Sequence, residues 1–341
     1  MDKRDYSIDV SRGIACLLVV VGHVPTTPSF LHTWIYSFHM PLFFIISGIV
    51  INTNDSVKEF IKKRVRTLLV PYFLLNISVW LIETISKLLI GFMFSSKIDY
   101  QRITDGLLGV LIGFRLTNYY YILWFVIALF FGVICARAIV QFLKDDRWIA
   151  ICGVGLIVAN AILWKYVKGM PFSIDMLPLA TGFVLLGFAA KSILKQCEEK
   201  KACLWGFPLL ALNAVIAVIA SNYYGDVDLY NCQIGGICFS LINSLIGSCA
   251  IIFISKIITR NRWIEFLSAN SLAFYAFQNK LVIPVFDKAL KLADRMILNN
   301  CLMKFEWVFA CIGSITVLSI ISIIINKVTP WMVGKHKTEK K

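Results

Sequence analysis

The sequence is poor in charged residues and contains no long polar segment. Only 16% of its 341 residues are Asp, Glu, Lys or Arg, whereas an average soluble domain has about 25%. It shows no repeat of fixed period, no low-complexity tract and no linker long enough to separate domains. These absences exclude a soluble multidomain protein and a repeat protein. They predict one domain that covers residues 1–341.

The cysteines lack the spacing of a metal site. The chain has ten of them, none in a C-x-x-C pair and most within apolar runs. We therefore expect no bound metal. The two halves of the sequence also lack clear similarity, which argues against a transporter built from inverted repeats.

Apolar runs, by contrast, recur from one end of the chain to the other. Hydrophobic residues make up 58% of the sequence, and the mean hydropathy is +0.75. Runs of about 20 apolar residues are long enough to cross a bilayer as helices. We predict an all-α, polytopic integral membrane protein with about ten transmembrane helices. The expected spans are roughly 8–25, 34–53, 68–94, 118–143, 148–165, 174–194, 203–221, 233–256, 268–286 and 304–326, with a shorter interfacial or re-entrant helix at 101–115.

The net charge of +14 reflects membrane topology rather than a nucleic-acid partner. Most of the 34 Lys and Arg residues lie in alternate connecting segments or near the chain ends, and such segments face the cytoplasm in membrane proteins. This distribution places both termini in the cytoplasm, in agreement with an even number of spans. The basic segments are the N-terminus, 54–67, 144–147, 191–202, 256–262 and the C-terminal tail.

The first span, Ser7–Val24, carries three ionisable side chains on one side. Arg12 and His23 are eleven residues apart, so they lie within roughly 20° of one helix face and about 16 Å apart along the axis. Asp9 lies one turn before Arg12. Charges inside a membrane are costly and usually mark a functional site. The alternative is a structural Asp9–Arg12 pair, which does not explain His23.

A second histidine lies near His23 in the expected fold. The short connection 26–33 makes the first two spans antiparallel neighbours, so His39 in SFHMPLFFIISG can approach His23 near the outer half. Histidine is well suited to act as a general base near neutral pH. The alternative for each is an interfacial histidine that is hydrogen-bonded to a backbone carbonyl. Gly48 lies in the same span as His39, and its lack of a side chain would allow the close approach of either a neighbouring helix or a ligand.

The cytoplasmic segment KEFIKKRVR (58–66) has two interpretations. It can be a topogenic loop that touches anionic lipid. It can also be an anion site, in which Arg64 and Arg66 hold the phosphates of a cytoplasmic ligand. Composition alone does not decide between them.

Polar residues also interrupt later spans. Asp175 in PFSID either caps a helix or bonds an acceptor hydroxyl. The consecutive residues Gln278, Asn279 and Lys280 cannot share one helix face, so the helix is expected to break there or to border a cavity. In the third span, Glu83 and Lys87 form an i,i+4 pair or part of a wet cavity.

Three motifs together resemble the start of the membrane acyltransferase-3 family. They are IDVSRGIACLLVVVGH, SFHMPLFFIISG and KKRVRTLLVPY, in that order and spacing. YILWFVIALFF resembles a Trp-Phe span of the family, and PFSIDMLPLATGFVLLGFAAK resembles its fucose 4-O-acetylase-like branch. The resemblance covers nearly the whole chain and is most specific over the first 72 residues. Enzymes of this family O-acetylate surface polysaccharides, lipopolysaccharide sugars and peptidoglycan.

The resemblance implies roles for individual residues. His23 matches the essential histidine of the family, and Arg12 matches the arginine of its first-helix motif. Lys63 and Arg66 match a basic R-x-x-R pair whose first member is lysine here, which keeps the charge but loses the bidentate fork; Arg64 lies beside it. Many relatives have histidine where this chain has Gln278, so this position does not supply a general base.

Together, the residues and the resemblance predict a membrane O-acyltransferase in a bacterial inner membrane. Acetyl-CoA is expected to bind from the cytoplasm without a metal, with its thioester directed towards His23. His23 then deprotonates an acceptor hydroxyl or is itself acetylated, and the sequence leaves both routes open. The acceptor is a glycan or a lipid-linked sugar. The predicted site comprises His23, Arg12 and Asp9 for catalysis, Lys63, Arg64 and Arg66 for the donor, and His39, Asp175, Gln278 and Asn279 for the acceptor.

Two other functions fit a polar path through a helical bundle. A transporter or flippase for a lipid-linked saccharide would move its substrate unmodified. A non-catalytic membrane sensor would tolerate His23→Ala.

Overall fold

A computed structural model describes residues 5–95, 97–113, 123–297 and 305–335. Within these ranges the regular elements are helices, apart from one isolated antiparallel bridge between Asp228 and Gln233. The predicted all-α class is therefore confirmed. The helices are α1 (Tyr6–His23), α2 (Ser29–Tyr36), α3 (His39–Ile49), α4 (Val57–Arg64), η1 (Val65–Leu69), α5 (Val70–Phe94), α6 (Tyr100–Ile112), α7 (Trp124–Phe142), α8 (Asp146–Leu163), η2 (Pro171–Met176), α9 (Leu177–Ala189), α10 (Lys191–Gln196), α11 (Glu199–Tyr224), α12 (Ile237–Ile257), α13 (Arg262–Phe277), η3 (Gln278–Val282), α14 (Ile283–Ile297), α15 (Glu306–Val328) and η4 (Pro330–Val333).

Nine helical segments of the described chain are long and apolar enough to cross a membrane, so this is a multi-pass membrane protein. The sequence predicted about ten. The difference is the expected span 268–286, which the structure builds as parts of three consecutive helices, α13, η3 and α14. Polar residues at 278–280 fall in η3, a π-helix, where the backbone widens locally. The predicted irregularity at these residues is thus present without a break in the helix.

The ends of α1 and α4 follow their local sequence. The Asp5 carboxylate accepts a hydrogen bond from the Ser7 amide and caps α1, whose helical geometry stops at Val24, immediately before Pro25. Ser56 and Glu59 form a reciprocal capping box at the start of α4. These caps position both the first span and the basic segment that follows the second.

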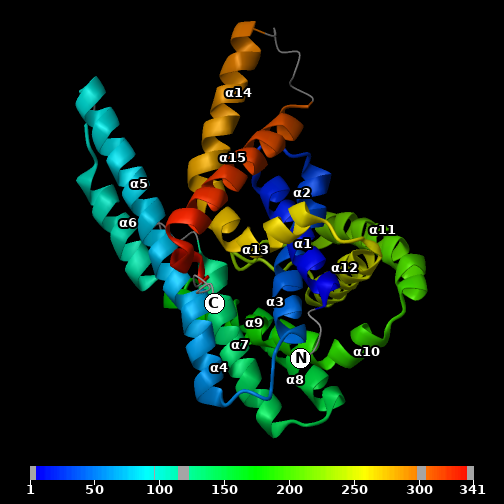
Figure 1. Cartoon of the computed structure of the whole chain (residues 1–341). Helices are drawn as coiled ribbons and strands as arrows, with labels where there is room; N and C mark the ends of the chain where they lie inside the picture. Colours follow the sequence, from blue (N-terminus) through cyan, green and yellow to red (C-terminus); the bar gives the residue numbers. More distant parts are fainter. Residues whose placement is uncertain (1–4, 96, 114–122, 298–304, 336–341) are drawn as a thin grey trace, which may run out of the picture.

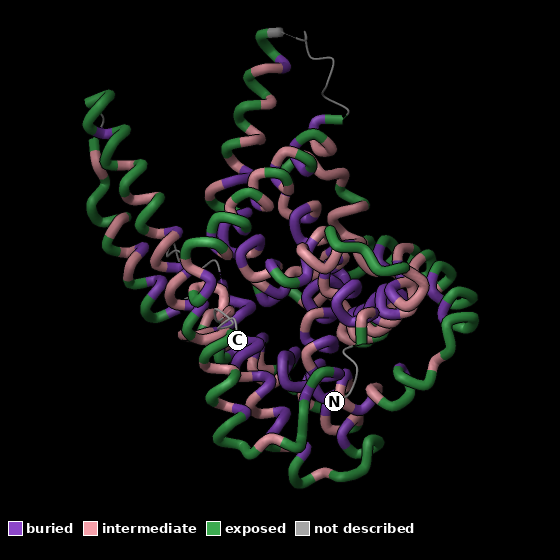
Figure 2. The backbone as a smooth tube through the Cα atoms, viewed as in Figure 1, coloured by how far each residue is buried: buried purple, intermediate pink, exposed green. Residues whose placement is uncertain are grey.

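Helix α1 lies at the centre of the bundle. It packs along α13 and also contacts α12, α3 and α2, while α9 packs against α3, α7 and α8. Helices α5 and α6 pair with each other and extend away from the bundle as an arm (Figure 1). Buried residues gather in the central helices, and exposed ones cover much of the arm (Figure 2). The exposed side chains of the arm are largely apolar, as expected for a surface in lipid.

Each described end of the chain lies against a basic segment of the bundle. The Tyr6 hydroxyl donates to the Thr259 carbonyl just before α13, and Gly334 lies against the backbone of Thr67 in η1. The basic segments around α4 and before α13 lie at the same end of the bundle. This arrangement agrees with the predicted placement of both termini on one side, which we call the basic end of the bundle.

Gly48 resolves an alternative that the sequence left open. It lies on α3 where this helix crosses α9, and a Cβ there would collide with the carbonyl oxygen of Val184. Gly187 on α9 makes the reciprocal close approach to Ile45. Gly48 therefore serves helix packing, as small residues do between membrane helices.

We expect Gly48→Ala to destabilise the protein by about 2 kcal/mol or more, because overpacking forces the two backbones apart. Thermal unfolding in detergent measures this as a lower melting temperature. Gly155→Ala on α8 is the matched control, since a Cβ there meets nothing within 4 Å. An unchanged melting temperature for Gly48→Ala would show that α3 and α9 are not packed this closely.

Candidate functional site

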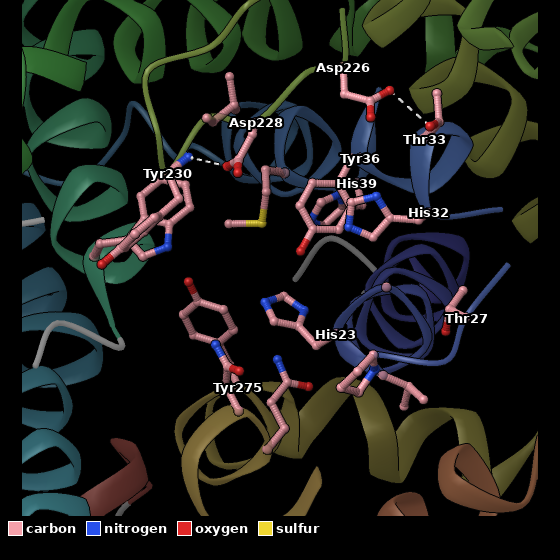
Figure 3. A pocket seen from close by; sticks show the side chains of 18 of the residues that line it. His23, Thr27, His32, Thr33, Tyr36, His39, Asp226, Asp228, Tyr230 and Tyr275 are labelled. Carbon is pink, nitrogen blue, oxygen red and sulfur yellow. Dashed lines mark hydrogen bonds between the residues drawn. The ribbon is translucent and has the colours of Figure 1, made fainter. Parts of the chain in front are cut away.

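A cavity of about 580 Å³ opens at the end of α1 that is opposite to the basic end. Its wall comes from α1, α2, α3, α7, α13, η3 and the loop between α11 and α12. Figure 3 shows polar and aromatic side chains that project into it from these elements. The lining residues are Gly22, His23, Val24, Pro25, Thr27, Ser29, His32, Thr33, Tyr36, His39, Met40, Trp124, Asp226, Asp228, Leu229, Tyr230, Tyr275, Gln278, Asn279 and Lys280.

Three of the four histidines of the chain line this cavity. Tyr36 lies among them, with ring centroids 3.9 Å from His32, 4.9 Å from His39 and 6.1 Å from His23. The structure thus brings His23 and His39 to one site, as the sequence predicted. His32 and Tyr36 were missed, because His32 fell in the expected connection 26–33 and Tyr36 in the expected span 34–53, whereas one short helix, α2, holds both.

The backbone fixes the tautomers of His23 and His39. The Nδ1 of His23 lies 2.8 Å from the Val19 carbonyl oxygen, and the Nδ1 of His39 lies 2.8 Å from that of Ile35. A carbonyl oxygen only accepts, so each Nδ1 carries the hydrogen and donates it. The Nε2 of the neutral ring is then an unprotonated nitrogen that can accept a proton. A hydrogen bond to a backbone carbonyl, which was the alternative to a catalytic role for each histidine, therefore also leaves the ring with a basic Nε2.

Acidic side chains from the loop between α11 and α12 border the cavity. The Asp228 carboxylate accepts hydrogen bonds from the backbone amides of Tyr230 and Asn231. Asp226 accepts one from the Thr33 hydroxyl at 2.9 Å. These bonds hold the loop over α2. The loop has no periodic pattern in the sequence, so neither aspartate was predicted.

Gln278 lies in η3 at the wall of the cavity. Gln278 is only 1% exposed, and neither its Oε1 nor its Nε2 has a hydrogen-bond partner in the described structure. Asn279 and Lys280 follow it and also line the cavity. A buried amide without partners costs about 1–3 kcal/mol. A ligand hydroxyl in the cavity would supply the missing bonds.

We expect Gln278→Leu to raise the KM for the acceptor about tenfold, because one or two hydrogen bonds of about 1 kcal/mol each are lost. The melting temperature should stay constant or rise, since the leucine removes an unsatisfied buried amide. Acceptor titrations at saturating donor measure the first effect. Exposed Gln196→Leu on α10 is the control. A fall in stability with no change in KM would assign the amide a purely structural role.

Asp9 and Arg12 lie at the other end of α1. The Arg12 guanidinium is 3.5 Å from the Asp9 carboxylate, which also accepts a hydrogen bond from the Ser268 hydroxyl of α13. Between Arg12 and His23, the same face of α1 holds Cys16 and Val19, both buried. The predicted polar stripe is therefore two polar ends with an apolar middle.

The three donor residues that the sequence predicted lie at the basic end but differ in orientation. Lys63 forms an exposed ion pair of 2.7 Å with Asp55, and Arg66 is exposed. Arg64 turns inward, with its guanidinium carbon 4.9 Å above the Phe60 ring and its Nε buried without a hydrogen-bond partner. Arg64 is thus the cation best placed to receive a ligand anion.

A cluster from the C-terminal part of the chain borders this region. The Lys335 ammonium donates to the side-chain oxygens of Asn270 and Asn326, each at 2.8 Å. Burial lowers the pKa of Lys335. Because Gly334 lies against Arg66 and Thr67, this ammonium is close to the basic segment. Sequence reasoning missed it because the contact joins distant parts of the chain.

The structure does not bring Asp175 to the cavity. It lies in η2 and is fully buried. Its carboxylate accepts hydrogen bonds from the Gly169 amide and the Cys232 thiol, while the Trp164 indole donates to its carbonyl. These contacts tie η2 to α8 and to the loop after α11.

Within the described ranges, no group of three or more His, Cys, Asp and Glu side chains has an arrangement that could hold a metal ion. In His23 and His39, the Nδ1 atom is hydrogen-bonded to a backbone carbonyl, and the Nε2 atom remains able to accept a proton. Together with the Gln278 amide and the tyrosine hydroxyls, they suit proton transfer and hydrogen bonding to a hydroxylated ligand.

The chain is similar to known proteins. A family model described as an acyltransferase domain matches residues 5–325. A protein named nodulation protein NolL from Sinorhizobium fredii is 30% identical over 216 residues, which are 58% of this chain and 52% of the relative. NolL from Mesorhizobium japonicum is 28% identical over 203 residues, or 55% of this chain and 48% of the relative. The chain spans about half the length of these relatives. No solved structure matches.

Proposed function

Because the chain belongs to the acyltransferase family whose model matches residues 5–325, we propose that it is a membrane O-acyltransferase of a bacterial inner membrane. It transfers an acyl group, in the simplest case acetyl, from cytoplasmic acyl-CoA to a hydroxyl of a cell-envelope or exported sugar. The observation that carries this proposal is the unprotonated Nε2 of His23 at a polar cavity of about 580 Å³. Both relatives come from bacteria, which supports the location.

His23 acts as the general base in this proposal. Its Nε2 takes the proton of the acceptor hydroxyl while the hydroxyl oxygen attacks the thioester carbonyl. A C–O bond forms, the C–S bond breaks, and the imidazolium returns the proton to the leaving thiolate. The Val19 carbonyl bond to Nδ1–H, at 2.8 Å, orients the ring and stabilises the imidazolium. His39 and Tyr36 contact the sugar beside it.

The donor nucleotide binds at the basic end. Arg64 and Arg12 act on each other electrostatically, and two like charges held together repel. An anion between them converts repulsion into attraction, which favours binding of CoA phosphates there. Asp9 holds Arg12 in place through the 3.5 Å pair. Lys63 and Arg66 add positive charge at the surface.

The thioester must travel along α1 to reach the base. Arg12 and His23 are eleven residues apart, about 16 Å along the helix axis, and the buried side chains of Cys16 and Val19 line the route. The flexible arm of CoA displaces these contacts as it enters. The acceptor approaches from the opposite end, where Gln278 and Asn279 line the cavity.

Membranes that contain the protein, incubated with labelled acetyl-CoA and envelope glycans, test the proposal. We expect an acetyl label on a glycan hydroxyl that depends on the protein and is released by mild base. Passage of labelled sugar across the membrane without acetylation would support a flippase instead. Absence of both activities would favour a non-catalytic sensor.

A further inference from the structure

A second, smaller cavity adjoins the first. It has a volume of about 40 Å³ and lies between α5, α6 and η3. Lys280 lines both cavities. The residues around the smaller one are Trp80, Glu83, Thr84, Lys87, Arg102, Ile103, Gly106 and Lys280.

This small cavity carries an excess of positive charge. Lys87, Arg102 and Lys280 border it, against the single carboxylate of Glu83. Glu83 forms a 2.7 Å ion pair with Lys87, while Lys280 is within electrostatic reach of all three other groups. Among the described residues that border this cavity, one carboxylate therefore faces three cations. In a membrane protein such an excess is costly unless an anion balances it.

The helices that present these cations are held to each other. The Trp80 indole of α5 donates to the Ile103 carbonyl of α6 at 3.0 Å, close to Arg102. In the same turns of α5, the side chains of Leu81, Ile85 and Leu89 are apolar and exposed. A cationic pocket thus shares Lys280 with the main cavity and is bordered by α5, a helix that also carries a surface suited to hydrocarbon.

We propose that Lys87, Arg102 and Lys280 bind the phosphate of a lipid-linked acceptor. This inference rests on the proposed function and specifies its acceptor as a sugar joined through phosphate to a lipid. The sugar occupies the main cavity beside His23, the phosphate lies in the small cavity, and the hydrocarbon follows the exposed face of α5. Phosphate oxygens accept charge-assisted hydrogen bonds from ammonium and guanidinium groups, so the three chemical parts of such an acceptor meet three matching surfaces.

Paired acceptors test this inference. The full chain, in phosphatidylcholine nanodiscs with labelled acetyl-CoA, receives one sugar on a polyprenyl diphosphate or the same sugar on a neutral polyprenyl ether. We expect the wild type to prefer the phosphate-bearing acceptor in kcat/KM. In Arg102→Gln and Lys280→Gln this preference should fall about tenfold, the effect of one charge-assisted hydrogen bond of about 1.5 kcal/mol or more. Lys288→Gln, an exposed lysine on α14, should keep it.

Binding without the donor separates this inference from the proposed function. Titration with the sugar polyprenyl diphosphate should give about tenfold weaker binding for Arg102→Gln than for wild type. If the wild type binds this lipid but transfers no acetyl group, the result would contradict the proposed function and still support the phosphate site. Equal binding by wild type and Arg102→Gln, or no preference between the two acceptors, would overturn the inference. So would equal competition by phosphatidylglycerol, which would assign the cluster to bulk lipid head groups.

Discussion

Replacing His23 by Ala is expected to lower kcat for acyl transfer about 10³-fold. A positioned general base contributes roughly 10²–10⁴ in rate, and the alanine variant loses the Nε2 that takes the proton in the proposed reaction. The histidine is only half-buried and packs beside Tyr36, so the fold should survive. Initial rates with labelled acetyl-CoA and the melting temperature in detergent together measure the effect.

A second variant separates catalysis from structure. His23→Asn keeps a side-chain donor near the Val19 carbonyl but has no basic nitrogen in place of Nε2. We expect it to be as inactive as His23→Ala and to melt near the wild-type temperature. Recovery of activity in His23→Asn would mean that the residue only supports the end of α1. Label on the wild type but not on His23→Asn after incubation with acetyl-CoA alone would show that His23 carries the acyl group instead of acting as a base.

Replacing Arg64 by Gln is expected to raise the KM for acetyl-CoA between about tenfold and a hundredfold. Hydrogen bonds to a charged group contribute about 1.5–3 kcal/mol each, and 1.4 kcal/mol corresponds to a factor of ten. The value of kcat at saturating donor should change little, because Arg64 lies far from the reacting atoms. Donor titrations at fixed acceptor measure both constants.

The control for this effect lies on the same helix. Lys58 of α4 is exposed, so Lys58→Gln removes one positive charge from the basic end without altering the buried cation. We expect its KM to stay within about twofold of wild type, since exposed charges are screened. Equal increases in KM for the two substitutions would show that Arg64 contributes only to the overall positive charge of the basic end. An unaltered KM in Arg64→Gln would show that the donor does not bind at Arg64.

Periodicity and hydropathy predicted the frame of the fold. Runs of about 20 apolar residues indicated the spans because the bilayer imposes that length. The segment 268–286 was harder, since hydropathy does not show that polar residues 278–280 can be accommodated in a π-helix between two α-helices. Chain geometry also anticipated the neighbourhood of His23 and His39, because a short connection makes adjacent spans antiparallel.

The sequence was less informative where the site depends on distant segments. His32, Tyr36 and Asp228 reach the cavity through α2 and the loop after α11, and neither element has a long periodic pattern. Asp175 illustrates the opposite error. A polar residue at the start of a span is expected to have a hydrogen-bond partner, but the sequence does not show which one. In the structure the Asp175 carboxylate accepts hydrogen bonds from Gly169 and Cys232 instead of lining the cavity.

The stripe on α1 shows the same limit. Helix geometry correctly places Asp9, Arg12 and His23 on one side, yet it does not reveal what fills the turns between them. In the structure Cys16 and Val19 are buried there. In the proposed reaction the donor arm therefore has to part these packed side chains, so the sidedness of acyl transfer is the sharpest test of the proposal.

Sealed vesicles that hold acetyl-CoA on one side and the acceptor on the other provide that measurement. With labelled acetyl-CoA at the basic end and the acceptor at the face where His23 lies, we expect protein-dependent acetylation of the acceptor while the vesicles remain sealed. The reversed arrangement should give none. Transfer only when donor and acceptor share one side, or equal transfer in both arrangements, would contradict an acyl path along α1.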